Sequence, residues 1–304
     1  MKKIIMLTLL FIIIPYLIIQ FFTPSKELKF DYSESLIVRV KREAADKIDY
    51  VYLEDYITGV LAGELPITFS EEAFKAQAVA ARSYVLKKMD YNKNSEFDVY
   101  DSVKDQVYLD SNYLKSIWKN KYVEKINKIK KVVMDTSGEY LTYDGSIIDA
   151  FFFSTSVGYT ENSEDVFSNS VPYLRSVKSE WERDTSPVFS STVNLNIYEF
   201  YLKLGLPYKE KVITKVVDTT STGRIKKIRI NDVLFDGVDV RFKLNLKSNY
   251  FTIVQKDESI IITTKGYGHG VGLSQYGAEA MSKLGFKYDE ILKYYYQGVV
   301  LEKL

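Results

Sequence analysis

The 304-residue chain contains no cysteine and a single histidine, His269. The absence of cysteine excludes disulfides, thiolate zinc sites and a cysteine nucleophile. With one histidine, a metal site would have to rely on carboxylates, and a Ser-His-Asp triad would have to use His269. Acidic and basic residues nearly cancel, leaving a formal net charge of +1. Because nucleic-acid binding calls for a clustered basic face, nucleic acid is not an expected partner.

Aromatic residues are abundant, with 25 Tyr and 17 Phe. Flat aromatic faces suit sugar rings, but tyrosines also serve ordinary half-buried packing, so the composition leaves both roles open. The hydrophobic content is that of a folded protein. The length allows one large domain or two lobes around separate cores.

An uncharged apolar run extends from Ile4 to Phe22, behind Lys2 and Lys3. About 20 apolar residues are enough to cross a bilayer. The run exceeds the apolar region of a signal peptide, and TPSKELKF follows it without a small-residue cleavage site, so a retained anchor is favoured over a cleaved signal. The preceding lysines predict a cytoplasmic tip (1–3), a single-pass signal-anchor (4–22) and an extracytoplasmic body.

The remaining sequence predicts an α+β fold, with mixed helices and antiparallel β-sheet in a two-lobed body with a cleft. Residues 23–50 are expected to form a linker and the first strands, and 51–304 the main domain. A hairpin is expected around Asp144-Gly145, a capping box at Thr68-x-x-Glu71, and a β-rich lobe over about 190–264. That lobe includes 238–246, which alternates like a strand. Helices are predicted over 53–62, 70–88, 113–134, 273–284 and 288–296.

The segment LEDYITGVLAGELP places Glu64 between an apolar helix and Pro66. A carboxyl group among apolar neighbours that faces a cleft is partly desolvated, which raises its pKa and makes it a usable general acid near neutral pH. A glutamate at a helix end is also commonly a solvated surface residue. The pattern alone therefore leaves the role of Glu64 open.

The following helix, with the motif KAQAVAARSY, carries Gln77 and Arg82 in apolar surroundings. Buried polar side chains need partners, and a buried arginine needs an anion or several carbonyl groups. Either Arg82 pairs with an internal carboxylate and fixes the fold, or Gln77 and Arg82 line a cleft beside Glu64.

Near the C-terminus, GYGHGVGLSQYGA combines four glycines with His269 just before a predicted helix. Glycines permit close approach of a ligand to the backbone. Because no GxxxxGK pattern is present, a nucleotide site is not expected. We instead expect hydrogen bonds to a sugar, made by Tyr267, His269, Ser274, Gln275 and Tyr276.

In the segment AFFFSTSVGYTENSEDVF, a polar run follows a predicted buried strand. These side chains would present many hydrogen-bonding groups to a saccharide, or would cap the backbone of their own loop. The residues concerned are Ser154, Thr155, Ser156, Thr160, Glu161, Asn162 and Glu164.

Together these segments resemble the SpoIID (stage II sporulation protein D) family, bacterial cell-wall proteins that include the amidase enhancer LytB. The resemblance extends from about Tyr52 to Leu301, and GELP matches the family's proposed catalytic glutamate, here Glu64. It implies a peptidoglycan lytic transglycosylase that cuts glycan strands stripped of stem peptides during engulfment in endospore formation. The implied location is the mother-cell membrane, facing the septal or forespore wall. The implied partners are a cell-wall amidase and its membrane scaffold.

The resemblance also implies that no cofactor is required. Some relatives hold zinc through His or Cys around the polar run, whereas this chain has Phe153 where a His commonly stands, so we expect no metal. Glu161 and Glu164 are the candidates if a second acid assists Glu64. Two other functions stay open: a non-catalytic protein that binds stripped glycan and activates the amidase, and a structural membrane–wall linker.

Overall fold

The computed structural model describes residues 13, 26–33 and 35–304. The expected cytoplasmic tip and, apart from Ile13, the expected membrane anchor at 4–22 lie outside the described residues. Within the described part of the chain, no helix combines the length and the apolar character that a bilayer crossing requires.

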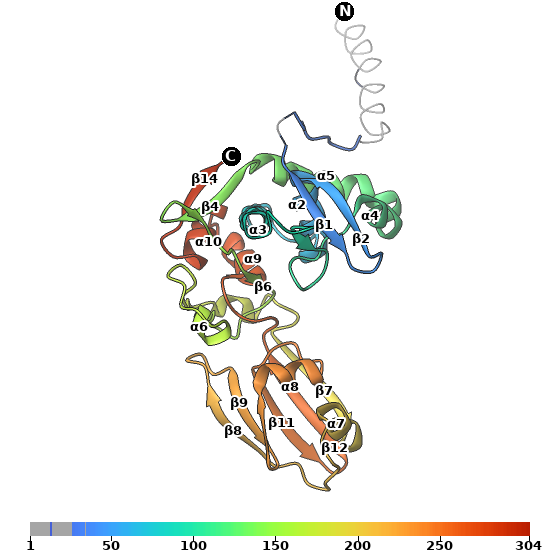
Figure 1. The fold of residues 1–304 in the computed structure, drawn as a ribbon, viewed down its shortest axis with the longest axis vertical. Coiled ribbons are helices and arrows are strands. Elements are labelled where there is room, and N and C mark those ends of the chain that lie inside the picture. Colours follow the sequence, from blue (N-terminus) through green and yellow to red (C-terminus); the bar gives the residue numbers. More distant parts are fainter. Residues whose placement is uncertain (1–12, 14–25, 34) are drawn as a thin grey trace, which may run out of the picture.

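The α+β class is confirmed: helices pack with small sheets in which antiparallel pairing prevails (Figure 1). Only the pairs β1–β3 and β6–β13 are parallel among the described strands. The sheets of the main body use β1 (Ile37–Arg42), β2 (Lys47–Tyr52), β3 (Val99–Tyr100), β4 (Glu139–Tyr143), β5 (Ser146–Ile147), β6 (Phe152–Phe153), β13 (Leu273–Ser274) and β14 (Val300–Lys303).

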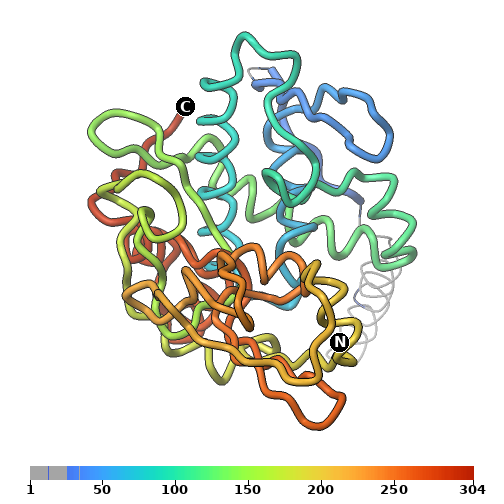
Figure 2. Tube along the Cα trace, turned by 60° about the horizontal axis from the view of Figure 1, so that its bottom comes forward, coloured from blue at the N-terminus to red at the C-terminus, as the bar shows by residue number. Residues whose placement is uncertain are grey.

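Helix α3 (Glu71–Tyr91) is the centre of the main body. Its alanines are buried on nearly every side, and these small side chains let other helices approach closely. In both views the N-terminal and C-terminal parts of the chain lie on opposite sides of α3 (Figures 1 and 2). The helices packed against it are α2 (Leu53–Glu64), α5 (Tyr122–Asp135), α9 (Gln275–Lys283) and α10 (Tyr288–Tyr295).

A second lobe, below the main body in Figure 1, has its own apolar core. It consists of two three-stranded sheets with strand orders β10-β9-β8 and β11-β12-β7, packed with two helices. Its elements are β7 (Ser190–Asn196), α7 (Ile197–Leu204), β8 (Thr214–Thr219), β9 (Ile225–Ile230), β10 (Val233–Asp236), α8 (Gly237–Lys243), β11 (Phe251–Lys256) and β12 (Ser259–Lys265).

The strand predicted over 238–246 is wrong, because this segment forms helix α8. Its alternating apolar residues include a pair four positions apart, Val240 and Leu244, which are buried together, whereas Val238 and Phe242 are exposed. Apolar residues at every second position necessarily include residues that are four positions apart. Residues four apart lie on the same face of a helix, so the pattern fits a helix as well as a strand. Packing against β9 selects the helix.

Two other local predictions are also corrected. Helix α3 begins after Ser70 without a side-chain cap, so the predicted capping box is absent; the backbone N–H of Ser70 instead donates to Glu279, 2.7 Å away. The single helix expected over 113–134 is interrupted at Lys119, where φ is +50°. It forms α4 (Ser111–Trp118), a short 3-10 turn and α5.

The hairpin predicted around Asp144-Gly145 is confirmed, with β4 paired to a short β5. Both turn residues have positive φ, +48° and +72°, as a tight two-residue hairpin turn requires. The polar region between β6 and β7 contains two further short helical turns, α6 (Ser163–Val166) and one over Glu180–Arg183.

Candidate functional site

Glu64 is the half-buried last residue of α2, and its carboxylate receives two hydrogen bonds. The backbone N–H of Val107 donates to Oε1 at 2.8 Å, and Nε2 of Gln275 donates to Oε2 at 3.3 Å. Burial raises the pKa of Glu64, and the two hydrogen bonds act in the opposite direction. The group therefore retains its proton to a higher pH than an ordinary glutamate.

Glycines in α2 bring Val107 within reach of the carboxylate. A Cβ atom at Gly63 would lie 2.5 Å from the carbonyl oxygen of Val107, and one at Gly59 would lie 2.4 Å from the ring of Tyr108. Both contacts would be impossible for a larger residue, so the segment after β3 packs directly on the helix backbone. Helix periodicity gave no sign that Val107 would serve the site, because it contributes only its backbone.

Gln275 is positioned by the start of α9. Ser274 caps this helix by accepting a hydrogen bond from the N–H of Gly277 at 3.3 Å, and the Ser274 hydroxyl donates to Glu182 at 2.6 Å. Strand β13, which contains Ser274, pairs with β6. The C-terminal glycine-rich motif is thereby fixed in a position that brings Gln275 to Glu64.

Glu182 is a buried carboxylate that sequence reasoning missed. Besides Ser274, it accepts hydrogen bonds from the N–H of Ser156 at 2.9 Å and from the hydroxyl of Ser179 at 2.7 Å. Burial raises its pKa, and the hydrogen bonds act against that rise. Glu182 lies in the helical turn Glu180–Arg183 between β6 and β7, and only the folded chain shows that it connects this region to α9.

His269 lies against the aromatic rings of Phe151, Phe153 and Phe167, with ring centroids 5.8–6.1 Å away. Burial, followed by the positive charges of arginines in the second lobe, lowers its pKa to about 4. The ring is therefore neutral at neutral pH. Because Nδ1 accepts a hydrogen bond from the N–H of Val271 at 3.1 Å, the proton is on Nε2.

The structure supports the structural role of Arg82 and corrects its placement as a substrate contact. Its guanidinium is fully buried and forms a two-point ion pair with Glu54, at 3.1 and 2.7 Å, and a hydrogen bond to the carbonyl of Glu139 at 2.8 Å. Gln77 is also buried, and its amide has no hydrogen-bond partner among the described residues. Neither side chain reaches solvent to contact a glycan.

The polar run after β6 mostly holds its own loop. Thr155 bonds to Ser186 at 2.7 Å, and the Ser156 hydroxyl donates to the carbonyl of Ser179 at 2.9 Å. Direct contact with a sugar requires exposed polar atoms. The side chains with no exposed surface, which are thereby corrected from substrate contacts to loop supports, are Thr155, Ser156, Thr160, Glu161 and Ser274.

Neither candidate for a second acid is suited to that role. Glu161 forms a fully buried ion pair with Arg224 of the second lobe, at 3.1 Å. Glu164 pairs with Arg175 at 2.8 Å, and this partner lowers the pKa of Glu164 to about 2. The neighbouring Asn162 accepts a hydrogen bond from the backbone of its own loop, 2.9 Å away.

Most of the remaining predicted residues keep some exposed surface. Tyr267 is 38% exposed and lies under the ammonium group of Lys247. Tyr276 packs edge-on against Phe69, just after Pro66 in the Glu64 segment. The predicted site residues that retain exposed surface are Glu64, Ser154, Tyr267, His269 and Tyr276, whereas Gln275 is buried beside Glu64. No group of three or more His, Cys, Asp and Glu side chains in the described part of the chain is placed to hold a metal ion.

Comparison with known proteins identifies the family. A family model described as "Stage II sporulation protein" (SpoIID) matches residues 41–143. The chain is 40% identical to the stage II sporulation protein D of Bacillus subtilis over 271 residues, which cover 88% of this chain and 79% of the relative. The corresponding protein of Bacillus amyloliquefaciens is also 40% identical, over 86% of this chain and 77% of the relative.

A protein of Bacillus subtilis called amidase enhancer is 31% identical over 81% of this chain, but the match covers only 40% of that longer protein. The chain therefore belongs to the stage II sporulation protein D family, and the resemblance seen in the two end motifs is confirmed.

Proposed function

We propose that this sporulation protein is a peptidoglycan lytic transglycosylase that cuts glycan strands stripped of stem peptides. The supporting observation is the partly exposed Glu64, whose pKa is raised by burial and whose carboxylate is held by Val107 and Gln275. A carboxyl group whose pKa is raised by burial, so that it keeps its proton to a higher pH than an ordinary glutamate, suits general acid catalysis.

In the proposed reaction, protonated Glu64 donates its proton to the glycosidic oxygen between N-acetylmuramic acid and N-acetylglucosamine as that bond breaks. The carboxylate then accepts the proton of the muramic 6-hydroxyl, whose oxygen bonds to the anomeric carbon and closes a 1,6-anhydro ring. Glu64 thus loses one proton and regains one, so the reaction leaves the carboxyl group in its starting state. General acid–base catalysis of this kind contributes roughly 10²–10⁴-fold.

An internal nucleophile removes the need for the second carboxylate of ordinary glycoside hydrolases. This agrees with the surroundings of Glu64, because both other candidate acids are held in ion pairs. Partly buried His269, with its proton on Nε2, and exposed Tyr267 are proposed to donate hydrogen bonds to the sugar. Gln275 is proposed to keep the Glu64 carboxylate oriented between the two proton transfers.

We further propose that the apolar residues 4–22 anchor the protein in the mother-cell membrane, with the body facing the wall that is degraded during engulfment. A partner amidase would supply the stripped strands and a membrane scaffold would hold the two together. The second candidate function is a clamp that binds stripped glycan and activates the amidase without cutting. The relative named amidase enhancer supports that alternative.

The test compares the full-length protein in detergent with its Glu64→Ala and Glu64→Gln variants. Each is incubated with intact and with amidase-stripped peptidoglycan, and products are identified by mass spectrometry. We expect anhydro-ended fragments from stripped glycan only, and their loss in both variants without a loss of folded structure. The same substitution at exposed Glu96 is the control.

Turnover retained by purified Glu64→Ala would contradict the proposed catalytic role. Sedimentation with stripped glycan, without any fragments from the wild type, would instead favour the amidase-activating clamp. That alternative also predicts that Glu64→Gln stimulates the amidase as strongly as the wild type does.

A further inference from the structure

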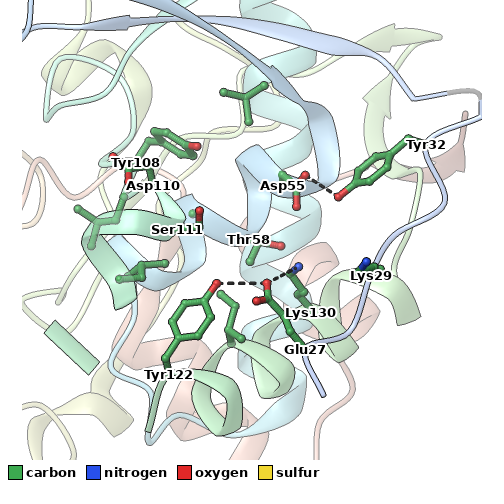
Figure 3. A pocket seen from close by; sticks show the side chains of 15 residues that line it. Glu27, Lys29, Tyr32, Asp55, Thr58, Tyr108, Asp110, Ser111, Tyr122 and Lys130 are labelled. Atoms are coloured by element: carbon green, nitrogen blue, oxygen red, sulfur yellow. Dashed lines mark hydrogen bonds and ion pairs between the residues drawn. The ribbon is translucent and has the colours of Figure 1, made fainter. Parts of the chain in front are cut away.

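A hollow lies beside the first half of α2, which contributes Asp55 and Thr58 to its lining (Figure 3). Its volume is about 550 Å³, and Glu64 is not among the residues that line it. Four parts of the chain surround it: the segment at 26–33, α2, the segment leading into α4, and α5. We call it the α2 pocket. Small-molecule sites in proteins commonly have volumes of about 300–1,000 Å³.

The floor of the α2 pocket is apolar, formed by Leu109 and the buried Leu114 and Ile126. Most charged groups at its rim already have partners. Glu27 receives hydrogen bonds from Lys130 at 2.9 Å and from Tyr122 at 3.1 Å, as Figure 3 shows. These contacts also fix the segment at 26–33 as one wall of the pocket.

Asp110 pairs with Arg42 at 2.8 Å and caps α4, and Tyr32 donates to one oxygen of Asp55 at 2.7 Å. Four polar groups at the pocket have no hydrogen-bond partner among the described residues. They are the hydroxyls of Tyr108 and Ser111, the ammonium of Lys29 and the second oxygen of Asp55.

The apolar floor and the polar rim of the α2 pocket together limit the chemical class of ligand that it can bind. Three carboxylates at the rim, those of Glu27, Asp55 and Asp110, disfavour a phosphate or another polyanion. The polar rim disfavours a purely apolar ligand. An apolar floor below separate donors and acceptors suits a neutral molecule with several hydroxyls and a methyl-bearing amide, because each part finds a matching surface.

From these residues, we infer that the α2 pocket binds a sugar unit of an N-acetylated glycan strand, as a second saccharide site beside the catalytic one. The choice of glycan rests on the proposed function. One continuous segment links both sites: the N–H of Val107 bonds to Glu64, Leu109 bonds to the carbonyl of Gly59 at 3.3 Å, and Tyr108 and Asp110 line the pocket. Gly59 in the pocket lining and Glu64 are also on the same helix, α2, separated by a rise of about 7–8 Å, so a strand held in the pocket would be anchored within one or two sugar units of the catalytic carboxyl.

The test uses full-length protein in detergent with tri-N-acetylchitotriose as the probe. Binding is measured by titration calorimetry, and a diazirine derivative of the same sugar is crosslinked and mapped by mass spectrometry. Ser111→Trp fills the pocket, whereas Ser116→Trp, at another exposed serine of α4 that does not line the pocket, is the matched control. The inference predicts crosslinks within residues 108–114 that Ser111→Trp removes and Ser116→Trp retains, with at least a tenfold loss of affinity for that site.

Crosslinks confined to peptides around Glu64 and Gln275, or equal binding by the two tryptophan variants, would overturn the inference. If Ser111→Trp does not fold, Asp55→Asn serves instead: weaker crosslinking of 108–114 supports the pocket, and unchanged crosslinking overturns it. The readout is binding, so it is independent of cleavage. A wild-type protein that crosslinks at 108–114 but cuts no glycan would contradict the proposed function alone.

Discussion

Gln275 Nε2 lies 3.3 Å from Glu64 Oε2, and this hydrogen bond joins two motifs that are 211 residues apart in the chain. It favours the ionised form of Glu64, whereas burial favours the protonated form. The balance between the two sets the pH at which Glu64 can act as an acid. Gln275 is thereby a residue that adjusts the acid as well as orienting it.

Gln275→Met removes this donor at similar volume. Because the ionised form of Glu64 then loses a stabilising contact, its pKa should rise further, and the alkaline limb of the pH–rate profile should move to higher pH. A hydrogen bond to a charged group contributes about 1.5–3 kcal/mol at good geometry, so at this long distance we expect a shift of about half to one pH unit. Cleavage of stripped glycan across pH gives the measurement, and the exposed Gln297→Met should leave the limb in place. A limb that stays put or moves to lower pH in Gln275→Met would refute this role.

His269 should not titrate in the physiological range. Its folded pKa of about 4 lies below the usual 6.5, so the unfolded chain binds the extra proton first as the pH falls. The contribution of His269 to stability is therefore complete above about pH 6.5 and declines as the pH falls toward 4. Because the chain has one histidine, its imidazole signals in an NMR titration need no assignment. A midpoint near 6.5 in the folded protein would contradict the buried, neutral ring; the urea-unfolded chain is the reference that should show it.

Arg224 and Glu161 should be strongly coupled in stability. Arg224 also donates to the carbonyl of Gly268 at 2.9 Å, so the pair joins the second lobe to the glycine-rich loop. Arg224→Met leaves a buried carboxylate without its cation and should cost about 3–5 kcal/mol in the free energy of unfolding. Adding Glu161→Gln removes that uncompensated charge, so the double variant should be more stable than Arg224→Met alone. Denaturant unfolding of Arg224→Met, Glu161→Gln and the double variant provides the comparison, and costs that simply add would rule out the coupling.

Comparing alanine variants of two glycines with positive φ, Gly272 and Gly285, separates the effect of backbone strain from the effect of close packing. Gly272 has φ +80°, and a Cβ there would lie 2.1 Å from the carbonyl oxygen of Phe151, whereas Gly285 has φ +96° and open space around it. Both alanine variants incur the strain of a left-handed backbone, about 1–3 kcal/mol. Gly272→Ala must also displace Phe151, so its melting temperature should fall further, and its cleavage activity should fall because the loop carrying His269 and Gln275 shifts. Equal destabilisation of the two variants would show that this close contact is dispensable.

The sequence alone located helices and turns correctly where several local signals indicated the same structure. The apolar period located α2, α3 and the two C-terminal helices, and Asp144-Gly145 located a hairpin that forms as expected. The two end motifs carried the family resemblance, which the comparisons confirm. The same local signals failed for α8, because a short apolar alternation fits either a strand or one face of a helix, and contact with β9 decides between them.

The sequence by itself determined the absence of thiol chemistry and the family of the chain, and it singled out Glu64 and Gln275 in two distinctive motifs. Only the tertiary structure decided which polar residues are accessible. Arg82, Glu161 and Ser274 belong to motifs as distinctive as that of Glu64, yet their side chains are buried in partner networks. The reason is that burial and pairing depend on residues distant in sequence. Glu54, Arg224 and Glu182 supply those partners, and no local pattern identifies them before the chain folds around α3.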